Sequence, residues 1–223
     1  EYGLDVIQGY GLSEASPLIT VNPPSRPKPE SIGMVIPSDE VEIRDLNDEG
    51  VGEIAARGPN IMQGYYKNRS ATEETLTPDG WLLTGDVGYF DDEGYLYITG
   101  RKKSVIVTRG GKNVYPEEVE EKLTKSPLIE EALVFSPDDS EIQALIYPAL
   151  EETELRLKSK SLPVSPENIW ELVREEVRAA NAGLEPYKRV RHFALRTEEF
   201  PKTTTRKIKR FLFKDLSLTQ NTK

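Results

Sequence analysis

The stretch "GRKKSVIVTRGGKNVYPEEVE", residues 100–120, is where the chain changes from one structural pattern to another. Within it, residues 103–109 form a short β-branched run that favours a strand, and the double glycine after them favours a turn. Pro116 suits the first position of a helix, and Glu117 and Glu118 follow where the helix dipole favours acidic side chains. A strand, a turn and a helix are therefore expected here, in that order.

Short apolar segments separated by turns fill residues 31–100 and predict strands. Segments 41–45 and 52–58 are typical of strands, and residues 89–100 predict an aromatic-rich hairpin around an Asp-Glu-Gly turn. Segment 4–10 predicts a short buried strand that ends in a glycine turn. This part of the chain is therefore expected to be mostly β, as a small barrel or a distorted sheet.

Helices and strands alternate after the opening stretch. Segments 130–137 and 141–149 predict two strands, and segment 189–196 predicts a last one. A helix is expected over 165–180, because a serine that can cap it is followed by proline at its first position. Residues 151–164 are charged and have no apolar periodicity, so a solvated insertion is expected there. The second half of the chain is thus predicted to be α+β.

Charge also divides the chain into two parts. Residues 1–100 hold 6 Lys or Arg and 18 Asp or Glu, a net charge of -12, whereas residues 101–223 hold 23 and 20, a net charge of +3. Such asymmetry suggests two bodies with different tasks. We therefore predict an α+β chain with a β-rich part at 1–100, a small α+β domain at 101–212 and a tail at 213–223.

Composition narrows the class of protein. With 37% hydrophobic and 30% charged residues, the chain is expected to be globular and soluble. It has no cysteine, which excludes disulfides, cysteine-bound zinc and a cysteine nucleophile, and its single histidine, His192, cannot form a histidine metal site alone. His192 is expected to be a partly buried strand residue. No transmembrane span or signal peptide is recognised, and a cytoplasmic location is expected.

Four stretches together resemble a known family. They are "QGYGLSEASPLITVNP" (8–23), "GWLLTGD" (80–86), the opening stretch (100–120) and "PKTTTRKIKR" (201–210). In order and spacing they resemble the adenylate-forming superfamily, which includes acyl-CoA synthetases, luciferases and the adenylation domains of peptide synthetases. The first stretch looks most like that of bacterial long-chain fatty acyl-CoA ligases.

This resemblance implies a two-step reaction and a division of the chain. A fatty acid carboxylate attacks the α-phosphate of ATP, with Mg²⁺ present, and the thiol of coenzyme A then displaces AMP. Residues 1–100 would be the C-terminal end of the large AMP-binding domain, and 101–212 the small domain that swings between the two steps. The family's phosphate loop precedes the segment matched at 8–23, so we expect a C-terminal fragment that lacks the N-terminal part of the same enzyme and is inactive alone.

The resemblance also assigns roles on the nucleotide side. Tyr10 matches an aromatic ring that stacks on adenine, and Ser13 matches a hydroxyl that meets the phosphate. Glu14 matches the residue that helps to hold Mg²⁺, an ion that prefers oxygen ligands. Asp86 matches the aspartate that binds the ribose hydroxyls, and Arg101 matches an arginine that reaches the ribose or phosphate end.

Further roles are implied for the second half of the chain. Lys103 matches the hinge, and Gly110 and Gly111 match the face presented to coenzyme A during thioester formation. Lys207 matches the lysine that bridges the acyl carboxylate and the α-phosphate during adenylation. The sequence departs from the family pattern at Arg206, where a glycine is usual.

Three alternatives stay open. The enzyme could load a carrier protein instead of coenzyme A, although no carrier-like segment follows residue 210. The basic stretch 186–210 could bind nucleic acid, but the acidic chain and the few aromatic residues in that stretch argue against a nucleic-acid partner. The chain could also be a non-catalytic regulatory module. Peripheral membrane contact is kept open for a fatty-acid enzyme, without an encoded anchor.

Overall fold

A computed structural model describes residues 6–137, 139–204, 206–213 and 216–218 of the chain. The chain divides into two compact units, Glu1–Lys103 and Ser104–Lys223. Most of the predicted tail, and residues 4 and 5 of the first predicted strand, lie outside the described residues. Among the described residues, none of the helices combines the length and the apolar character that crossing a membrane requires.

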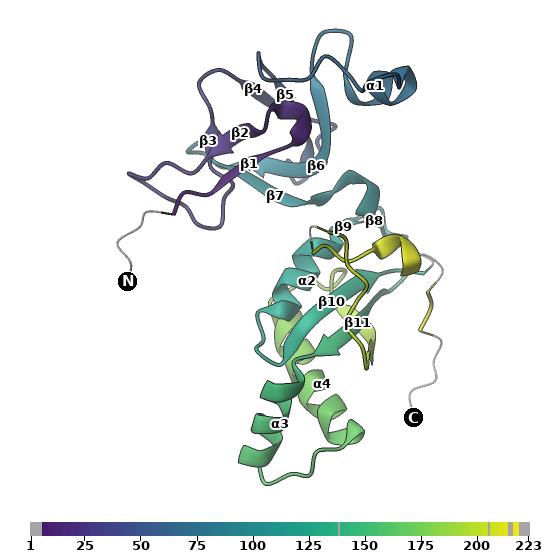
Figure 1. Ribbon diagram of the computed structural model, residues 1–223. Coiled ribbons are helices and arrows are strands. Elements are labelled where there is room, and N and C mark those ends of the chain that lie inside the picture. The colour runs from purple at the N-terminus through teal and green to yellow at the C-terminus, as the bar shows by residue number, and fades with distance from the viewer. Residues whose placement is uncertain (1–5, 138, 205, 214–215, 219–223) are drawn as a thin grey trace. The chain divides into compact units, whose positions relative to one another are not determined.

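The first unit contains two antiparallel sheets (Figure 1). The smaller sheet has the order β1-β2-β3, formed by β1 (Gly9–Gly11), β2 (Leu18–Val21) and β3 (Met34–Val35). The larger has the order β4-β5-β6-β7, formed by β4 (Glu40–Arg44), β5 (Gly52–Arg57), β6 (Leu82–Phe90) and β7 (Leu96–Arg101). The larger sheet does not close on itself and its register shifts within β5/β6 and β6/β7, so it is the distorted sheet and not the barrel.

The predicted hairpin at 89–100 is confirmed as the β6–β7 connection. Its turn is stabilised by Asp91, whose Oδ1 accepts hydrogen bonds from the backbone N–H groups of Glu93 (3.0 Å) and Tyr95 (2.9 Å). Gly94 has a φ of 80°, a conformation that glycine adopts without steric penalty. The turn sets the pairing of Tyr89 with Tyr97, and a register shift between Val87 and Gly88 then places Asp86 opposite Arg101.

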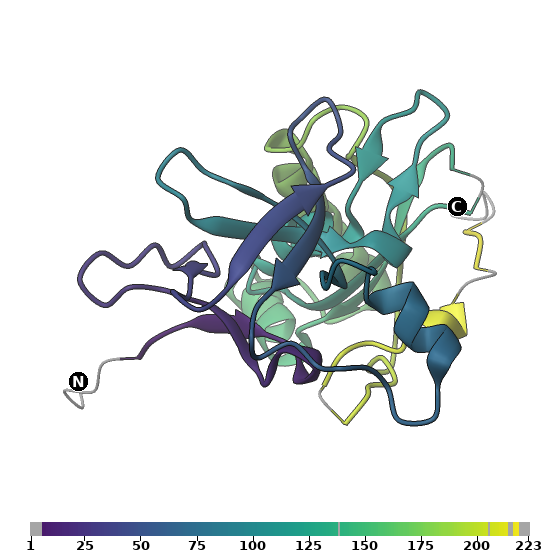
Figure 2. The same ribbon diagram turned by 90° about the horizontal axis from the view of Figure 1, so that it is seen from above.

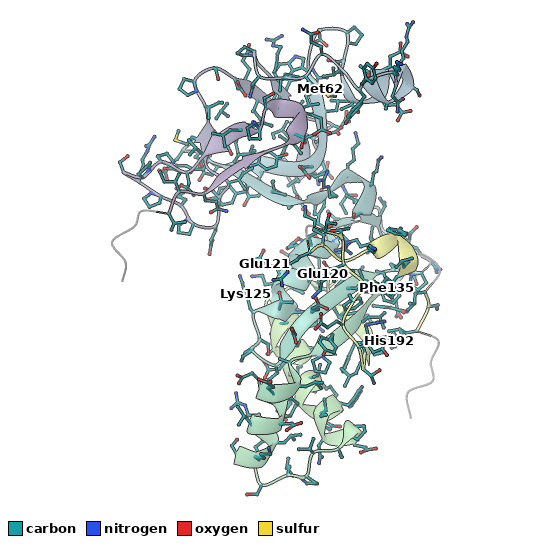
Figure 3. The ribbon with its side chains drawn as sticks, in the orientation of Figure 1. Met62, Glu120, Glu121, Lys125, Phe135 and His192 are labelled. Carbon is teal, nitrogen blue, oxygen red and sulfur yellow. The ribbon has the colours of Figure 1, made fainter. Side chains whose placement is uncertain are left out.

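Two short helices complete the first unit. The 3-10 helix η1 (Ser13–Ala15) follows β1, and α1 (Arg69–Thr75), which was not predicted, is capped by Asn68, whose side chain accepts a hydrogen bond from Ala71 N. An extended connection leads from β5 to α1 (Figure 2). The core beside η1 consists of Ala15, Ile19, Ala56 and Leu82, against which Tyr10 and Met62 pack (Met62 is labelled in Figure 3).

The second unit is built on one mixed sheet. It has the order β10-β11-β12, formed by β10 (Ile129–Phe135), β11 (Ile142–Pro148) and β12 (Val190–Leu195). The β11–β12 pair is parallel, and the crossover contains α3 (Leu150–Ser159) and α4 (Pro166–Ala182). A hairpin of β8 (Ile106–Val107) and β9 (Asn113–Val114) precedes α2 (Pro116–Thr124), and the 3-10 helix η3 (Arg210–Phe213) follows the sheet.

The predicted helix starts are confirmed in this unit. Pro116 opens α2, and Val119 and Leu123 on its apolar face are fully buried. Ser165 caps α4 by accepting a hydrogen bond from Asn168 N at 3.3 Å, and Val173 of that helix joins the same core. Both helices therefore cover the sheet through one apolar stripe each.

Two sequence expectations are wrong. Residues 151–164 are not a solvated insertion, because α3 occupies most of them and its Leu157 is fully buried against Leu128 and Leu172. Segment 4–10 is not a buried strand, since Val6 is 95% exposed and the strand starts only at Gly9. The expectation for His192 is confirmed, because it lies partly buried on β12, where its Nε2 is 3.0 Å from Glu141 Oε2.

Candidate functional site

Asp86 stands at the centre of a three-residue contact in the first unit. It lies on β6 directly opposite Arg101 of β7, and the Arg101 Nε lies 2.8 Å from its Oδ1. Tyr10, which comes from β1, donates its hydroxyl to the other carboxylate oxygen, Oδ2, at 2.6 Å. The structure thus brings together three of the residues that the sequence predicted for the nucleotide, although they are far apart along the chain.

The electrostatics of this contact favour one arrangement of protons. Burial, together with the adjacent Asp86 carboxylate, raises the pKa of Tyr10 well above its usual range, so the phenol remains a donor. The Asp86 side chain is only 8% exposed, whereas that of Arg101 is 47% exposed. A carboxylate has about four lone-pair positions, and these two contacts use one on each oxygen. Asp86 can therefore accept further hydrogen bonds from a pair of hydroxyl groups.

Ser13 and Glu14 lie together on η1, close in sequence to Tyr10. Ser13 is exposed, and Glu14 accepts a hydrogen bond at Oε1 from the Tyr65 hydroxyl at 2.8 Å. That hydrogen bond is the largest cause of a raised pKa at Tyr65. Sequence reasoning missed Tyr65, because nothing in the pattern links it to a residue 51 positions earlier.

Glu14 could hold Mg²⁺ together with phosphate oxygens of a substrate. The described residues contain no group of three or more His, Cys, Asp or Glu that could hold a metal ion without help. Magnesium, however, is commonly bound through one or two carboxylates together with phosphate oxygens of the substrate. The single carboxylate of Glu14, oriented by Tyr65, is compatible with that mode.

The end of the first unit is anchored beside the predicted hinge. Lys102 Nζ lies 2.6 Å from Glu53 Oε2 and 3.1 Å from Asp45 Oδ2. Glu53 is only 6% exposed and also accepts from the backbone N–H of Gly85 at 3.2 Å. Lys103, the residue after this anchor, is exposed. Sequence reasoning did not identify Lys102 or its partner.

In the second unit, Gly110 and Gly111 form the turn between β8 and β9. Gly111 has a φ of 73°, and its N–H donates to Thr108 O at 2.8 Å. Gly110 also lines a cavity of about 410 Å³. Four basic side chains line the same cavity: Arg109, Lys112, Arg189 and Arg191. Glu141 is the one acidic residue among the described residues that line it, so the cavity beside the predicted glycine face has an excess of positive charge, which suits a ligand that carries phosphate groups.

Lys207 lies on a short hairpin of the second unit and is exposed. Lys202 and Ile208 form an isolated antiparallel bridge, and Thr203 N donates to Lys207 O at 2.8 Å. The Lys207 N–H in turn donates to Thr203 Oγ1 at 3.2 Å. Arg206 has a φ of 62°, which explains why glycine suits this position.

Comparison with known proteins points to one family. Residues 1–66 match the family described as AMP-binding enzyme, and residues 103–215 match the family described as AMP-binding enzyme C-terminal domain. The chain is 36% identical over 222 residues to the long-chain-fatty-acid–CoA ligase FadD15 of Mycobacterium bovis, covering 93% of the chain and 36% of the relative. It is 37% identical over 215 residues to a long-chain-fatty-acid–CoA ligase of Bacillus subtilis, with coverage of 93% and 36%. The chain thus spans little more than a third of these relatives.

Solved structures give the same picture of the fold. The anthranilate CoA ligase AuaEII in complex with anthranoyl-AMP matches with a TM-score of 0.75 and 29% identity, over 95% of this chain and 38% of that one. The o-succinylbenzoate CoA synthetase MenE from Bacillus subtilis, in complex with its acyl-adenylate intermediate, matches with a TM-score of 0.76 and 31% identity, over 96% and 42%. The predicted α+β fold is confirmed.

Replacement of Arg206 by glycine should stabilise the hairpin that carries Lys207. A left-handed conformation costs a non-glycine residue about 1–2 kcal/mol, and the extra freedom of glycine in the unfolded chain offsets about 0.5–1 kcal/mol of the gain. We expect Arg206→Gly to raise the free energy of unfolding by about 0.5–1 kcal/mol in urea titrations. Arg206→Ala retains the Cβ atom and should not raise the free energy of unfolding. Equal effects of both variants would contradict the interpretation that the backbone at Arg206 is strained.

Proposed function

Because this chain belongs to the AMP-binding enzyme family, we propose that it is the C-terminal part of an ATP-dependent, AMP-forming acid–CoA ligase. Within that class we propose a long-chain fatty acid as the substrate, which the fatty-acid ligases among its relatives support. The observation that carries the proposal is the contact of Asp86 with Tyr10 and Arg101, since it presents a carboxylate with unused acceptor positions beside an exposed guanidinium.

In the first step, the first unit binds the nucleotide of ATP. Asp86 accepts hydrogen bonds from the ribose hydroxyls, while Arg101 supplies positive charge beside it. The Tyr10 ring provides a planar surface for adenine, and its hydroxyl keeps Asp86 in place. Ser13 donates to a phosphate oxygen. Glu14 would hold Mg²⁺, which neutralises phosphate charge when bound. MenE has been solved with ATP and magnesium ion, which supports both ligands.

Lys207 acts in the same step from the second unit. The acyl carboxylate attacks the α-phosphorus, a new oxygen–phosphorus bond forms, and pyrophosphate leaves. The Lys207 ammonium stabilises the negative charge that the carboxylate and phosphate oxygens share in the transition state. As a compact charge on a flexible arm, it suits delivery by the small domain at 101–212, with Lys103 as the hinge.

In the second step, coenzyme A is the acceptor. Its thiolate attacks the acyl carbonyl, a carbon–sulfur bond forms, and AMP leaves with the oxygen. The Gly110–Gly111 turn lets a narrow ligand approach the backbone closely. The cationic cavity beside it suits the phosphate groups at the other end of coenzyme A. A carrier protein has no equivalent of that nucleotide, so the cavity favours coenzyme A over the carrier-protein alternative.

Removal of the Lys207 amine should separate the two steps. In the complete enzyme, we expect Lys207→Ala to slow fatty-acid-dependent ATP–pyrophosphate exchange by roughly 10²–10³-fold, because one transition-state contact is lost. Thioester formation from supplied acyl-adenylate should remain within about twofold of the parent rate. Lys209→Ala, two positions along the same hairpin, serves as the control. Equal loss of both steps would contradict the role.

The chain of 223 residues should show no exchange activity by itself. The reason is that the phosphate loop of the family is not within it, so the triphosphate would lack its main binding site. Isotope exchange between pyrophosphate and ATP, measured with a saturating fatty acid, checks this. Robust exchange by the purified chain would show that the loop is dispensable.

Neutralising the cavity should weaken coenzyme A selectively. We expect the double variant Lys112→Gln, Arg191→Gln to raise KM for coenzyme A roughly tenfold, or about 1.4 kcal/mol, while leaving ATP–pyrophosphate exchange unchanged. Pantetheine, which lacks the nucleotide phosphates, should react equally well with both proteins. Arg178→Gln, an exposed change outside the cavity, is the matched control. Should a carrier protein be acylated while coenzyme A is not, the alternative acceptor would be favoured.

A further inference from the structure

The hairpin that carries Lys207 is held at both ends by carboxylates of the second unit. We infer that Glu131 and Glu120 are positioning residues for Lys207, each fixing one arm of the hairpin through an ion pair with Lys202 or Arg210. The inference rests on the proposed role of Lys207 in adenylation. Its evidence is the geometry of the hairpin, which the sequence did not reveal.

The hairpin itself has little internal support. Apart from the bridge between Lys202 and Ile208, the arms are joined by backbone hydrogen bonds such as Lys209 N to Pro201 O at 2.9 Å. An isolated hairpin of this size is marginally stable in water. The direction in which Lys207 points therefore depends on what holds the two arms to the rest of the unit.

Glu131 holds the first arm from β10. Its Oε1 lies 2.5 Å from Lys202 Nζ, and its Oε2 accepts a hydrogen bond from the Phe200 N–H at 3.0 Å. The Glu131 side chain is 13% exposed and that of Lys202 is 30% exposed, and Lys202 Nζ also lies 3.1 Å from Oε2 of the exposed Glu199. Phe200 is itself 2% exposed and packs with Leu133 and Leu145. One carboxylate thus fixes both the backbone and a side chain of the first arm.

Glu120 holds the second arm from α2. One of its oxygens accepts from the Val134 N–H at 2.6 Å, and the other contacts Arg210 Nη2. Arg210 Nη1 also donates to Val134 O at 3.4 Å, so the ion pair brackets one residue of β10. The Glu120 side chain is 13% exposed. In Figure 3, Glu120 lies on the side of α2 toward the sheet, whereas Glu121 and Lys125 lie on the other side.

The two pairs differ in their electrostatics. The contact with Glu131 raises the pKa of Lys202, which keeps the first arm charged and bound. Burial raises the pKa of Glu120 to about 7, while Arg210 opposes that rise by favouring the ionised form. At neutral pH, substitution of Glu131 is therefore expected to affect the hairpin more than substitution of Glu120.

These anchors matter for catalysis because Lys207 is exposed and lies only five residues after Lys202 and three before Arg210. A lysine on a loosely held hairpin would spend little time in the orientation that adenylation requires. Holding both arms on the second unit's own core elements lets that unit deliver Lys207 in one fixed orientation. The carboxylates act through the hairpin and do not touch the substrate.

The test compares matched glutamine variants of the complete enzyme. We expect Glu131→Gln to slow ATP–pyrophosphate exchange at least tenfold while thioester formation from supplied acyl-adenylate stays within about twofold. Backbone hydrogen exchange in residues 201–210 should become faster in the same variant, which is a readout independent of catalysis. Glu130→Gln, its exposed neighbour on β10, should change none of these quantities. Glu120→Gln should act in the same direction as Glu131→Gln, with Glu121→Gln as its control.

A double-mutant cycle tests the pair if Glu131→Gln unfolds the unit. Lys202→Gln removes the partner of Glu131 on the hairpin and should slow ATP–pyrophosphate exchange to the same extent. The double variant should have a rate of ATP–pyrophosphate exchange little lower than that of either single variant. Unchanged adenylation and unchanged hydrogen exchange in Glu131→Gln would overturn the inference, as would equal slowing of both half-reactions. If Lys207→Ala left adenylation intact, the proposed function would fail, and hydrogen exchange alone would still decide whether the hairpin is anchored.

Discussion

A buried carboxylate must be satisfied by hydrogen-bond donors, and this requirement at Asp86 organises the first unit. Its two oxygens are bound by Tyr10 from β1 and Arg101 from β7, so one side chain joins both sheets of the unit. The β6–β7 pairing places Arg101 opposite Asp86, through the turn at Asp91 together with the register shift between Val87 and Gly88. The same contacts that satisfy the carboxylate leave lone-pair positions unused on both oxygens, and the proposed binding of ribose hydroxyls would use them.

In the second unit, several basic side chains are likewise paired with carboxylates. Lys188, Lys202 and Arg210 of the basic C-terminal stretch each bind a carboxylate of the unit, namely Glu118, Glu131 and Glu120. Positive charge that is already paired contributes little to binding a phosphate backbone, which disfavours the nucleic-acid interpretation. Arg191, which lines the cavity, and Lys207 are exposed. The stretch therefore combines structural ion pairs with cations that are available to small ligands.

Sequence patterns predicted most of the strands, the helix starts at Pro116 and Pro166, and the fold class. They failed at α3, because its buried stripe is so narrow that the charged residues around Leu157 masked it. They also failed at the start of the chain, where apolar residues such as Val6 are exposed instead of buried. Hydrophobic character alone does not say whether a segment has a surface to pack against.

The sequence by itself determined the family, most of the strands and the identity of the candidate residues, because these follow from local motifs and their spacing along the chain. The tertiary structure alone decided their partners. Tyr65 beside Glu14, Glu53 beside Lys102 and Glu131 beside Lys202 join residues between 49 and 71 positions apart. Such contacts leave no periodic signal, since hydrogen-bond geometry depends on where strands pair and helices pack, and that is fixed only when the chain folds.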